Sequence, residues 1–119
     1  MKRYGMVIGL RAKDYEEYKR EHAAVWPGVL ATIESCNMRN YTIYYMPGPV
    51  SGADGLLFGN YEYHGTDHPA DMAKMAADPE TQRWWRLMVP MQKRLDGTPE
   101  GEFWMPLEDV FHFDGPKVS

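Results

Sequence analysis

The chain has 119 residues, a formal charge of −4 at pH 7 and 44% hydrophobic residues. This length predicts a single domain, residues 1–119, that buries about two thirds of the surface of its unfolded chain. Lysine and arginine are spread along the sequence and form no cluster, which argues against nucleic acid as a partner. No apolar run approaches the roughly 20 residues that span a bilayer, so we expect no membrane partner either.

The single cysteine, Cys36, predicts a reducing compartment, because it can form neither an internal disulfide nor, alone, a zinc site. The apolar run after Arg3 is at the lower length limit of a secretory signal, and charged residues follow it without a small-residue cleavage site. We therefore expect a cytoplasmic protein.

The first half of the chain predicts a strand, a helix and a second strand. Residues 3–11 are rich in β-forming side chains, and residues 14–37 repeat apolar positions with the period of a helix. Pro27 interrupts this pattern, and we expect it to end, bend or restart the helix. Residues 38–46 then alternate in the manner of a strand and are rich in aromatic residues.

The second half predicts a strand, two helices and a closing strand. Residues 56–63 should pair with the preceding strand across a turn-rich loop at 47–55. Residues 70–77 predict a short helix, and Asp78 should cap another that begins with proline. The apolar stripe of that last helix consists of Trp84, Leu87, Met88, Met91 and Leu95. Residues 103–113 are expected to form the closing strand.

The resulting order of elements is strand, helix, strand, strand, helix, strand. This is the order of a ferredoxin-like α+β fold, βαββαβ. The helices then cover one face of the sheet, and nothing within the chain remains to cover the other. Because an uncovered apolar face is unfavourable in water, we expect a second copy to cover it, which predicts a homodimer of the dimeric α+β barrel type.

His22 is the most informative residue, because it places a titratable ring within the apolar stripe of the first helix. The stripe repeats at steps of three and four and consists of Tyr15, Tyr18, His22, Val25, Trp26, Val29 and Ile33. A histidine in such a stripe is more often a core residue whose nitrogens are hydrogen-bonded, so the stripe alone leaves its role open. Tyr18 lies one turn earlier on the same face and could touch the same ligand.

Trp84 and Trp85 are neighbours in the last predicted helix and therefore point about 100° apart. One can pack in the core while the other walls a groove. A flat apolar ring with a single N–H donor suits the C–H face and the hydroxyl rim of a sugar. Considered alone, the pair fits a core role at least as well as a sugar site.

Other polar residues carry weaker signals. His64 and His68, near Asp67 and Asp71, lack the spacing of a helical metal site, so we predict no metal there. His112 is expected to be an ordinary strand residue, with a second acid or base as the alternative. No phosphate loop, nucleophile elbow or dinucleotide fingerprint occurs.

Five short segments carry a further signal through their order and separation. They are Glu17-Tyr18-Lys19-Arg20-Glu21-His22, Trp26-Pro27, Asn40-Tyr41-Thr42-Ile43-Tyr44, Gln82-Arg83-Trp84-Trp85 and Glu108-Asp109-Val110-Phe111-His112. Together they resemble the L-rhamnose mutarotase family nearly from end to end. The resemblance implies a ferredoxin-like dimer that acts on a free monosaccharide.

By this resemblance the protein is an isomerase that interconverts the α and β anomers of L-rhamnose or a related 6-deoxyhexose such as L-fucose. His22 then matches the family's proton donor. The positions that match its sugar contacts are Tyr18, Tyr41, Trp84 and Trp85. Ring opening needs one proton delivered to the ring oxygen and one removed from the anomeric hydroxyl, and no metal or organic cofactor. The second proton-transfer group stays open between Tyr18, a water and Glu108.

Two departures from the family affect specificity more than the reaction. Residues 23–25 read Ala-Ala-Val where the family commonly has Asn-Pro, and the loops at 47–55 and 64–69 are longer than in the simplest members. Loops decide which sugar hydroxyls are recognised. Two alternatives share parts of this pattern: a dimeric α+β-barrel monooxygenase or haem-binding protein, and a non-catalytic sugar-binding module.

Overall fold

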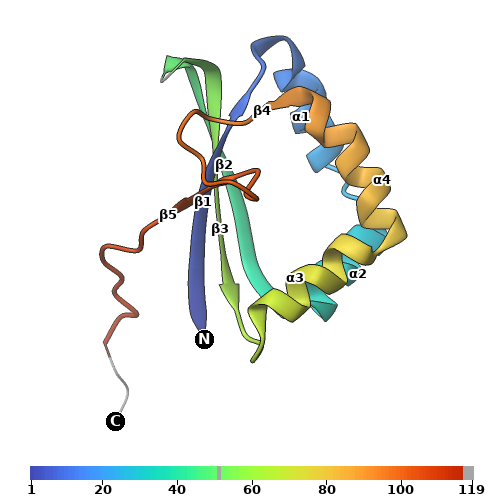
Figure 1. The fold of residues 1–119 in the computed structure, drawn as a ribbon, viewed down its shortest axis with the longest axis vertical. Coiled ribbons are helices and arrows are strands. Elements are labelled where there is room, and N and C mark those ends of the chain that lie inside the picture. The colour runs from blue at the N-terminus through green and yellow to red at the C-terminus, as the bar shows by residue number, and fades with distance from the viewer. Residues whose placement is uncertain (51, 117–119) are drawn as a thin grey trace.

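A curled antiparallel sheet forms one layer of the protein and helices form the other (Figure 1). The computed structural model describes residues 1–50 and 52–116. The strands are β1 (Lys2–Leu10), β2 (Met38–Val50), β3 (Ala53–Tyr63), β4 (Gln92–Lys93) and β5 (Met105–Leu107). They follow the order β2-β3-β1-β4, and β5 pairs with β1 as well. The predicted ferredoxin-like α+β fold is confirmed.

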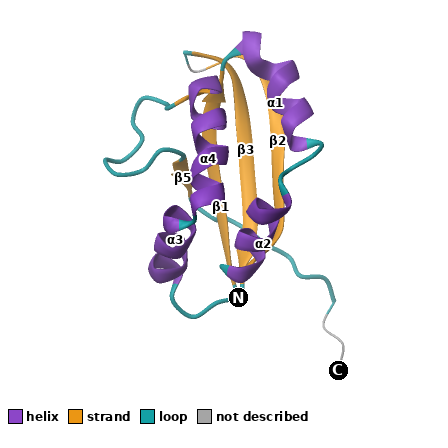
Figure 2. Cartoon of the chain, turned by 90° about the vertical axis from the view of Figure 1, so that its right-hand side faces the viewer, coloured by secondary structure: helices purple, strands orange, loops and turns teal. Residues whose placement is uncertain are grey.

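The helices lie on one face of this sheet (Figure 2). They are α1 (Tyr15–His22), α2 (Pro27–Ser35), α3 (His68–Ala77) and α4 (Pro79–Met88), with short 3₁₀ turns η1 (Ala12–Asp14) and η2 (Val89–Met91). In Figure 2, α1 and α2 lie toward β2, whereas α4 lies toward β1. Within the described part of the chain, no helix is long and apolar enough to cross a bilayer.

The predicted interruption at Pro27 divides the first helical region into two helices. α1 ends at His22, Trp26 is extended with φ −60° and ψ 136°, and α2 begins at Pro27. Proline suits the first position of a helix because its missing N–H would have no helical partner there. Asp78 caps α4 as predicted, since its carboxylate accepts a hydrogen bond of 2.9 Å from the main-chain N–H of Thr81.

The predicted loop at 47–55 is wrong, because strand pairing continues through most of it. β2 runs to Val50 and β3 begins at Ala53, and these two end residues pair with each other. The prolines of this segment are tolerated because β2 is an edge strand of the sheet, where a missing N–H removes fewer ladder bonds.

The closing part of the chain also differs from the prediction. α4 ends at Met88 and passes into η2 through Pro90, so Leu95 lies beyond the helix and packs against the cluster around Val7. Of the predicted strand at 103–113, only Met105–Leu107 pairs with β1. Pro106 lies inside this short strand and offers no N–H to the ladder.

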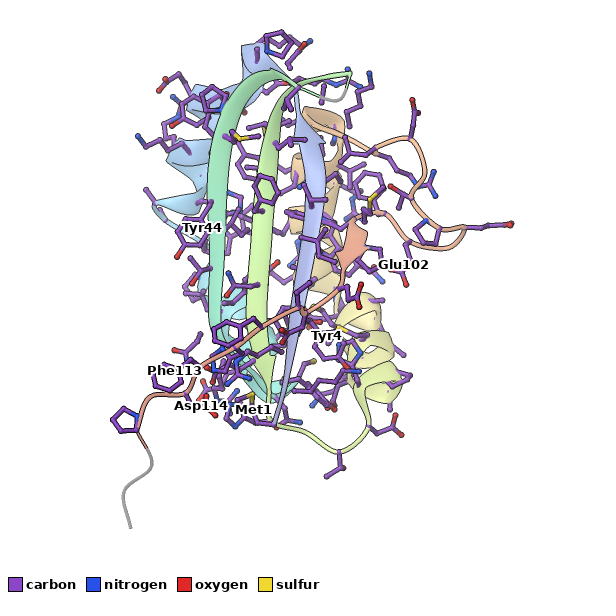
Figure 3. All side chains as sticks on the ribbon, turned by 90° about the vertical axis from the view of Figure 1, so that its left-hand side faces the viewer. Met1, Tyr4, Tyr44, Glu102, Phe113 and Asp114 are labelled. Carbon is purple, nitrogen blue, oxygen red and sulfur yellow. The ribbon has the colours of Figure 1, made fainter. Side chains whose placement is uncertain are left out.

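The two faces of the sheet have different surroundings. The helix-covered face holds the main core, whose buried residues are Ile8, Leu10, Tyr18, Val29, Leu57, Trp84, Met88 and Met91. The other face carries Tyr44, which is 61% exposed (Figure 3). Residues 108–114, the C-terminal arm, cross this open face without regular structure and end where Asp114 pairs with Arg3 at 2.7 Å.

Candidate active site

A cavity of about 400 Å³ lies between α1 and the neighbouring part of the sheet. Its walls combine residues of α1, β2 and β3, and they are Tyr15, Tyr18, Lys19, His22, Ala23, Ile43, Tyr44, Tyr45 and Leu57. Ligand pockets commonly measure about 300–1,000 Å³, so this cavity is large enough for a monosaccharide. The rings of Tyr15, Tyr18, Tyr45 and His22 give it flat apolar walls with a few polar atoms, whereas the side chain of Tyr44 belongs to the open face of the sheet.

His22, the last residue of α1, lines this cavity. Its Nδ1 lies 2.8 Å from the main-chain oxygen of Tyr18. A carbonyl oxygen only accepts hydrogen bonds, so Nδ1 carries the proton and the neutral ring has its lone pair on Nε2. Burial lowers the pKa of His22, and the Tyr18 carbonyl and Glu21 offset only part of this effect. Within the described residues, Nε2 has no hydrogen-bond partner.

Tyr18 stacks against His22, with ring centroids 4.2 Å apart and an angle of 25° between the rings. This contact follows from their spacing of four residues on one helix. The Tyr18 hydroxyl accepts a hydrogen bond of 3.2 Å from Nε2 of Gln92 on β4. Burial raises the pKa of Tyr18 to about 12, although the Gln92 bond works in the opposite direction. The phenol is therefore protonated at neutral pH.

Trp84 of α4 also contacts the His22 ring. The two rings meet edge to face with centroids 5.3 Å apart, and Trp26 meets Trp84 in the same way at 5.2 Å. Trp84 is only 6% exposed and does not line the cavity. Trp84 therefore contacts the proposed proton carrier without lining the cavity, and its role as a sugar contact stays a prediction.

The other residues predicted for the site lie farther from the cavity. Tyr41 lies where β2 pairing skips from Arg39 to Thr42, and its ring packs on Tyr61 with centroids 5.5 Å apart. Burial raises the pKa of Tyr41, and the neighbouring Tyr18 adds to the shift. Thus the structure brings Tyr18, His22 and Trp84 into contact and places Tyr41 in the neighbouring cluster that contains Cys36 and Tyr61.

Trp85 and Glu108 are not brought to this cavity within the chain. Trp85 is 40% exposed and lines a separate groove of about 480 Å³ on α4, together with Gln82, Arg86, Val89 and Pro90. Glu108 follows β5 and is exposed in the C-terminal arm. The two consecutive tryptophans therefore face different surroundings, as their angular separation predicts.

Sequence reasoning missed several residues of the site. Tyr15 and Tyr45 stack on each other with ring centroids 4.1 Å apart and line the cavity, but of the two only Tyr15 belongs to a predicted apolar stripe. Gln92 carried no signal, because it is 74 residues from Tyr18 and the predicted helix extended past it. Gln92 can belong to β4 because α4 ends at Met88, four residues earlier.

The remaining histidines have local partners outside the cavity. His64 pairs with Glu62 at 3.0 Å and His112 with Asp114 at 2.5 Å, both on exposed segments. His68 is hydrogen-bonded through Nε2 to the Tyr61 hydroxyl at 2.8 Å. Among residues 1–50 and 52–116, no three His, Cys, Asp or Glu side chains gather closely enough to hold a metal ion.

Comparison with known proteins now identifies the family. The sequence profile described as L-rhamnose mutarotase matches residues 3–113. The chain belongs to the L-rhamnose mutarotase family. This confirms the resemblance carried by the five sequence segments, and the matched range includes the cavity and both tryptophans.

Individual members of the L-rhamnose mutarotase family match over nearly their whole length. The L-rhamnose mutarotase of Oceanobacillus iheyensis is 29% identical, covering 96% of this chain and 100% of that protein. That of Sinorhizobium fredii is 30% identical over 94% of this chain and 98% of its own length. The crystal structure of an L-rhamnose mutarotase from Formosa agariphila has a TM-score of 0.70 at 19% identity and covers 96% of this chain and 100% of that one, which supports the shared fold.

Proposed function

We propose that this protein is a mutarotase that interconverts the α and β anomers of L-rhamnose. Membership of the L-rhamnose mutarotase family supports the reaction. The observation that carries the proposal in the structure is the stacked pair of Tyr18 and His22, which both line a sugar-sized cavity and of which His22 keeps Nε2 without a hydrogen-bond partner among the described residues. The family match also favours this function over an oxygenase or a haem protein.

His22 transfers a proton in both directions of the reaction. In the neutral ring Nε2 carries a lone pair, so on ring opening it accepts the proton of the anomeric hydroxyl as C1–O5 breaks. The resulting imidazolium donates that proton back to the C1 oxygen when the ring closes on the other face. His22 is thus the donor of the closure step, and rotation about C1–C2 between the two steps changes the anomer.

Tyr18 supplies the second proton. With a pKa of about 12, its phenol is protonated at neutral pH and cannot be the base that starts the reaction. It can donate its proton to O5 as the ring opens and recover it from that hydroxyl on closure. Both side chains return to their starting state, so no net proton or cofactor is consumed.

The aromatic walls suit a substrate that changes shape during the reaction. Tyr15 and Tyr45 offer stacked ring faces at the cavity, and such faces hold C–H surfaces without demanding one hydrogen-bond geometry. We propose Tyr41 and Trp84 as further residues of the sugar site, because both match sugar-contacting positions of the family, although neither lines the cavity. Trp85 is proposed as a sugar contact by family resemblance, from its separate groove.

The direct test is NMR saturation transfer between the two anomeric protons of a free sugar. L-Rhamnose, L-fucose and D-glucose should be compared at equal concentration, with and without catalytic amounts of the protein. We expect exchange above the spontaneous rate for L-rhamnose, a smaller gain for L-fucose and none for D-glucose. No gain with any of the sugars would refute the proposed function.

We also propose that the protein works as a homodimer in which a second copy covers the open face of the sheet. This face carries the exposed Tyr44, and the C-terminal arm exposes Val110, Phe111 and Phe113 by 88%, 84% and 70%. Large apolar side chains gathered in this way favour an interface. Sedimentation equilibrium should give twice the chain mass for the wild type, and substituting these three arm residues by serine should shift it toward monomer. A monomeric wild type would contradict the proposal.

We propose the cytoplasm as the place of action. Cys36 is fully buried and unpaired, which suits a compartment that keeps thiols reduced. Fractionation of the source cells should recover the protein with cytoplasmic marker enzymes. Recovery from the secreted fraction would argue against this placement.

A further inference from the structure

Gln92 links the end of the sheet to the proposed proton donor. It begins β4, pairs with Leu10 of β1 and is only 7% exposed. Its Nε2 lies 3.2 Å from the Tyr18 hydroxyl, and both side chains are buried at this contact. A buried amide needs hydrogen-bond partners within the protein, and Tyr18 is such a partner for the N–H of Gln92.

This hydrogen bond restricts the directions in which the Tyr18 hydroxyl can donate its own proton. Because the amide N–H fills one lone pair of the oxygen, the O–H of Tyr18 must point elsewhere. In the part of the chain that the structure describes, no acceptor receives it, and Tyr18 lines the cavity. The proton of the phenol is therefore not used by another group among the described residues.

The same bond becomes stronger during the proposed reaction. When Tyr18 gives up its proton, the oxygen gains negative charge in a buried place where water cannot stabilise it. A hydrogen bond to an ionised acceptor is roughly twice as strong as one between neutral groups. An N–H already aimed at the atom where charge develops stabilises the transition state more than the ground state.

We propose that Gln92 is a positioning residue of the mutarotase reaction, which orients the Tyr18 hydroxyl toward the sugar and stabilises its oxygen while the proton is away. This rests on the proposed function. The role belongs to one amide donor, so an apolar side chain of similar length should not replace it. Because the effect arises mainly in the transition state, it should lower kcat more than it raises KM.

The test is a double-mutant cycle of Gln92→Met and Tyr18→Phe, measured by anomer exchange of L-rhamnose. In the wild-type background, Gln92→Met should lower kcat about tenfold to a hundredfold, with KM nearly unchanged. In the Tyr18→Phe background there is no phenol to orient, so the same change should have almost no further effect. Gln92→Glu offers an acceptor in place of the donor and should be at least as slow as Gln92→Met.

Thr98→Val provides the matched control, because it removes another buried hydroxyl hydrogen bond, the one that Thr98 donates to the Leu95 carbonyl at 2.6 Å. This variant should keep wild-type kcat. Equal losses from Gln92→Met in both backgrounds would mean a purely structural role and would overturn the inference, as would an unchanged kcat in folded Gln92→Met and Gln92→Glu proteins. An inactive wild type would instead refute the proposed function, and this inference with it.

Discussion

Two clusters of tyrosine and histidine lie on the helix-covered side of the sheet, and they are built from the same chemical groups. In the first, at the cavity, Tyr18 stacks on His22 at 4.2 Å. In the second, beside α3, Tyr4 stacks on His68 at 4.0 Å, and Tyr61 and Tyr63 complete the group. Both histidines have a pKa lowered mainly by burial. Neither composition nor ring stacking separates the two clusters.

The clusters differ in where their polar atoms are used. Beside α3 three of the four rings have side-chain partners: the Tyr61 hydroxyl is hydrogen-bonded to Nε2 of His68 at 2.8 Å, and Tyr63 donates to Asp71 at 2.5 Å. At the cavity, Nε2 of His22 and the Tyr18 proton have no partner among the described residues. Polar atoms that bond to their neighbours hold structure, whereas polar atoms without a partner on residues that line a cavity can act on a ligand.

The strongest test of this difference replaces each histidine by asparagine. His22→Asn keeps a polar side chain at the end of α1 but removes the proton carrier, so the exchange of L-rhamnose anomers should fall roughly a hundred- to ten-thousand-fold. His68→Asn should leave the exchange rate close to that of the wild type. Saturation-transfer NMR on folded proteins measures both, and equal activity of wild type and His22→Asn would remove His22 from the mechanism.

The pH dependence of the reaction separates the two possible resting states of His22. Protonation of the ring removes the lone pair on Nε2, and burial lowers the pKa of His22 below its usual value of about 6.5. The catalysed rate should therefore rise about tenfold per pH unit below this lowered pKa and level off before neutral pH. The measurement is kcat/KM after subtraction of the spontaneous rate. A rate that falls as pH rises through this range would mean that the imidazolium is the resting form.

Sequence patterns predict the secondary-structure elements and the central residue of the site better than they predict the residues that complete the site. The helical stripe places Tyr18 and His22 together because residues four apart share a helix face. Gln92 escapes such reasoning, because its contact depends on where α4 ends and on strand pairing with Leu10. The apolar stripe distinguishes His22 from His68, but no local pattern tells whether the ring nitrogen of either histidine finds a tyrosine hydroxyl.

Replacing Tyr61 or Tyr18 by phenylalanine should have a smaller effect than His22→Asn. The first variant should change stability and the second should change kcat. Tyr61→Phe removes the hydroxyl that bonds to His68, so it should lower the free energy of unfolding by about 1 kcal/mol and leave kcat unchanged. Tyr18→Phe removes a hydroxyl of similar burial and should lower kcat. Urea unfolding and anomer exchange are measured on the same samples. A loss of kcat in Tyr61→Phe would show that the second cluster also serves the reaction.

The smallest expected effect concerns Trp85, whose groove lies apart from the cavity. If its exposed ring face contacts the sugar, Trp85→Ala should raise KM for L-rhamnose about two- to tenfold, the worth of a single aromatic contact, with kcat unchanged. Leu30→Ala, which shortens another exposed helix side chain, is the control and should change neither constant. An unchanged KM in Trp85→Ala would restrict the proposed sugar site to the cavity beside His22. Of the two tryptophans, only Trp84, which contacts His22, would then serve the reaction.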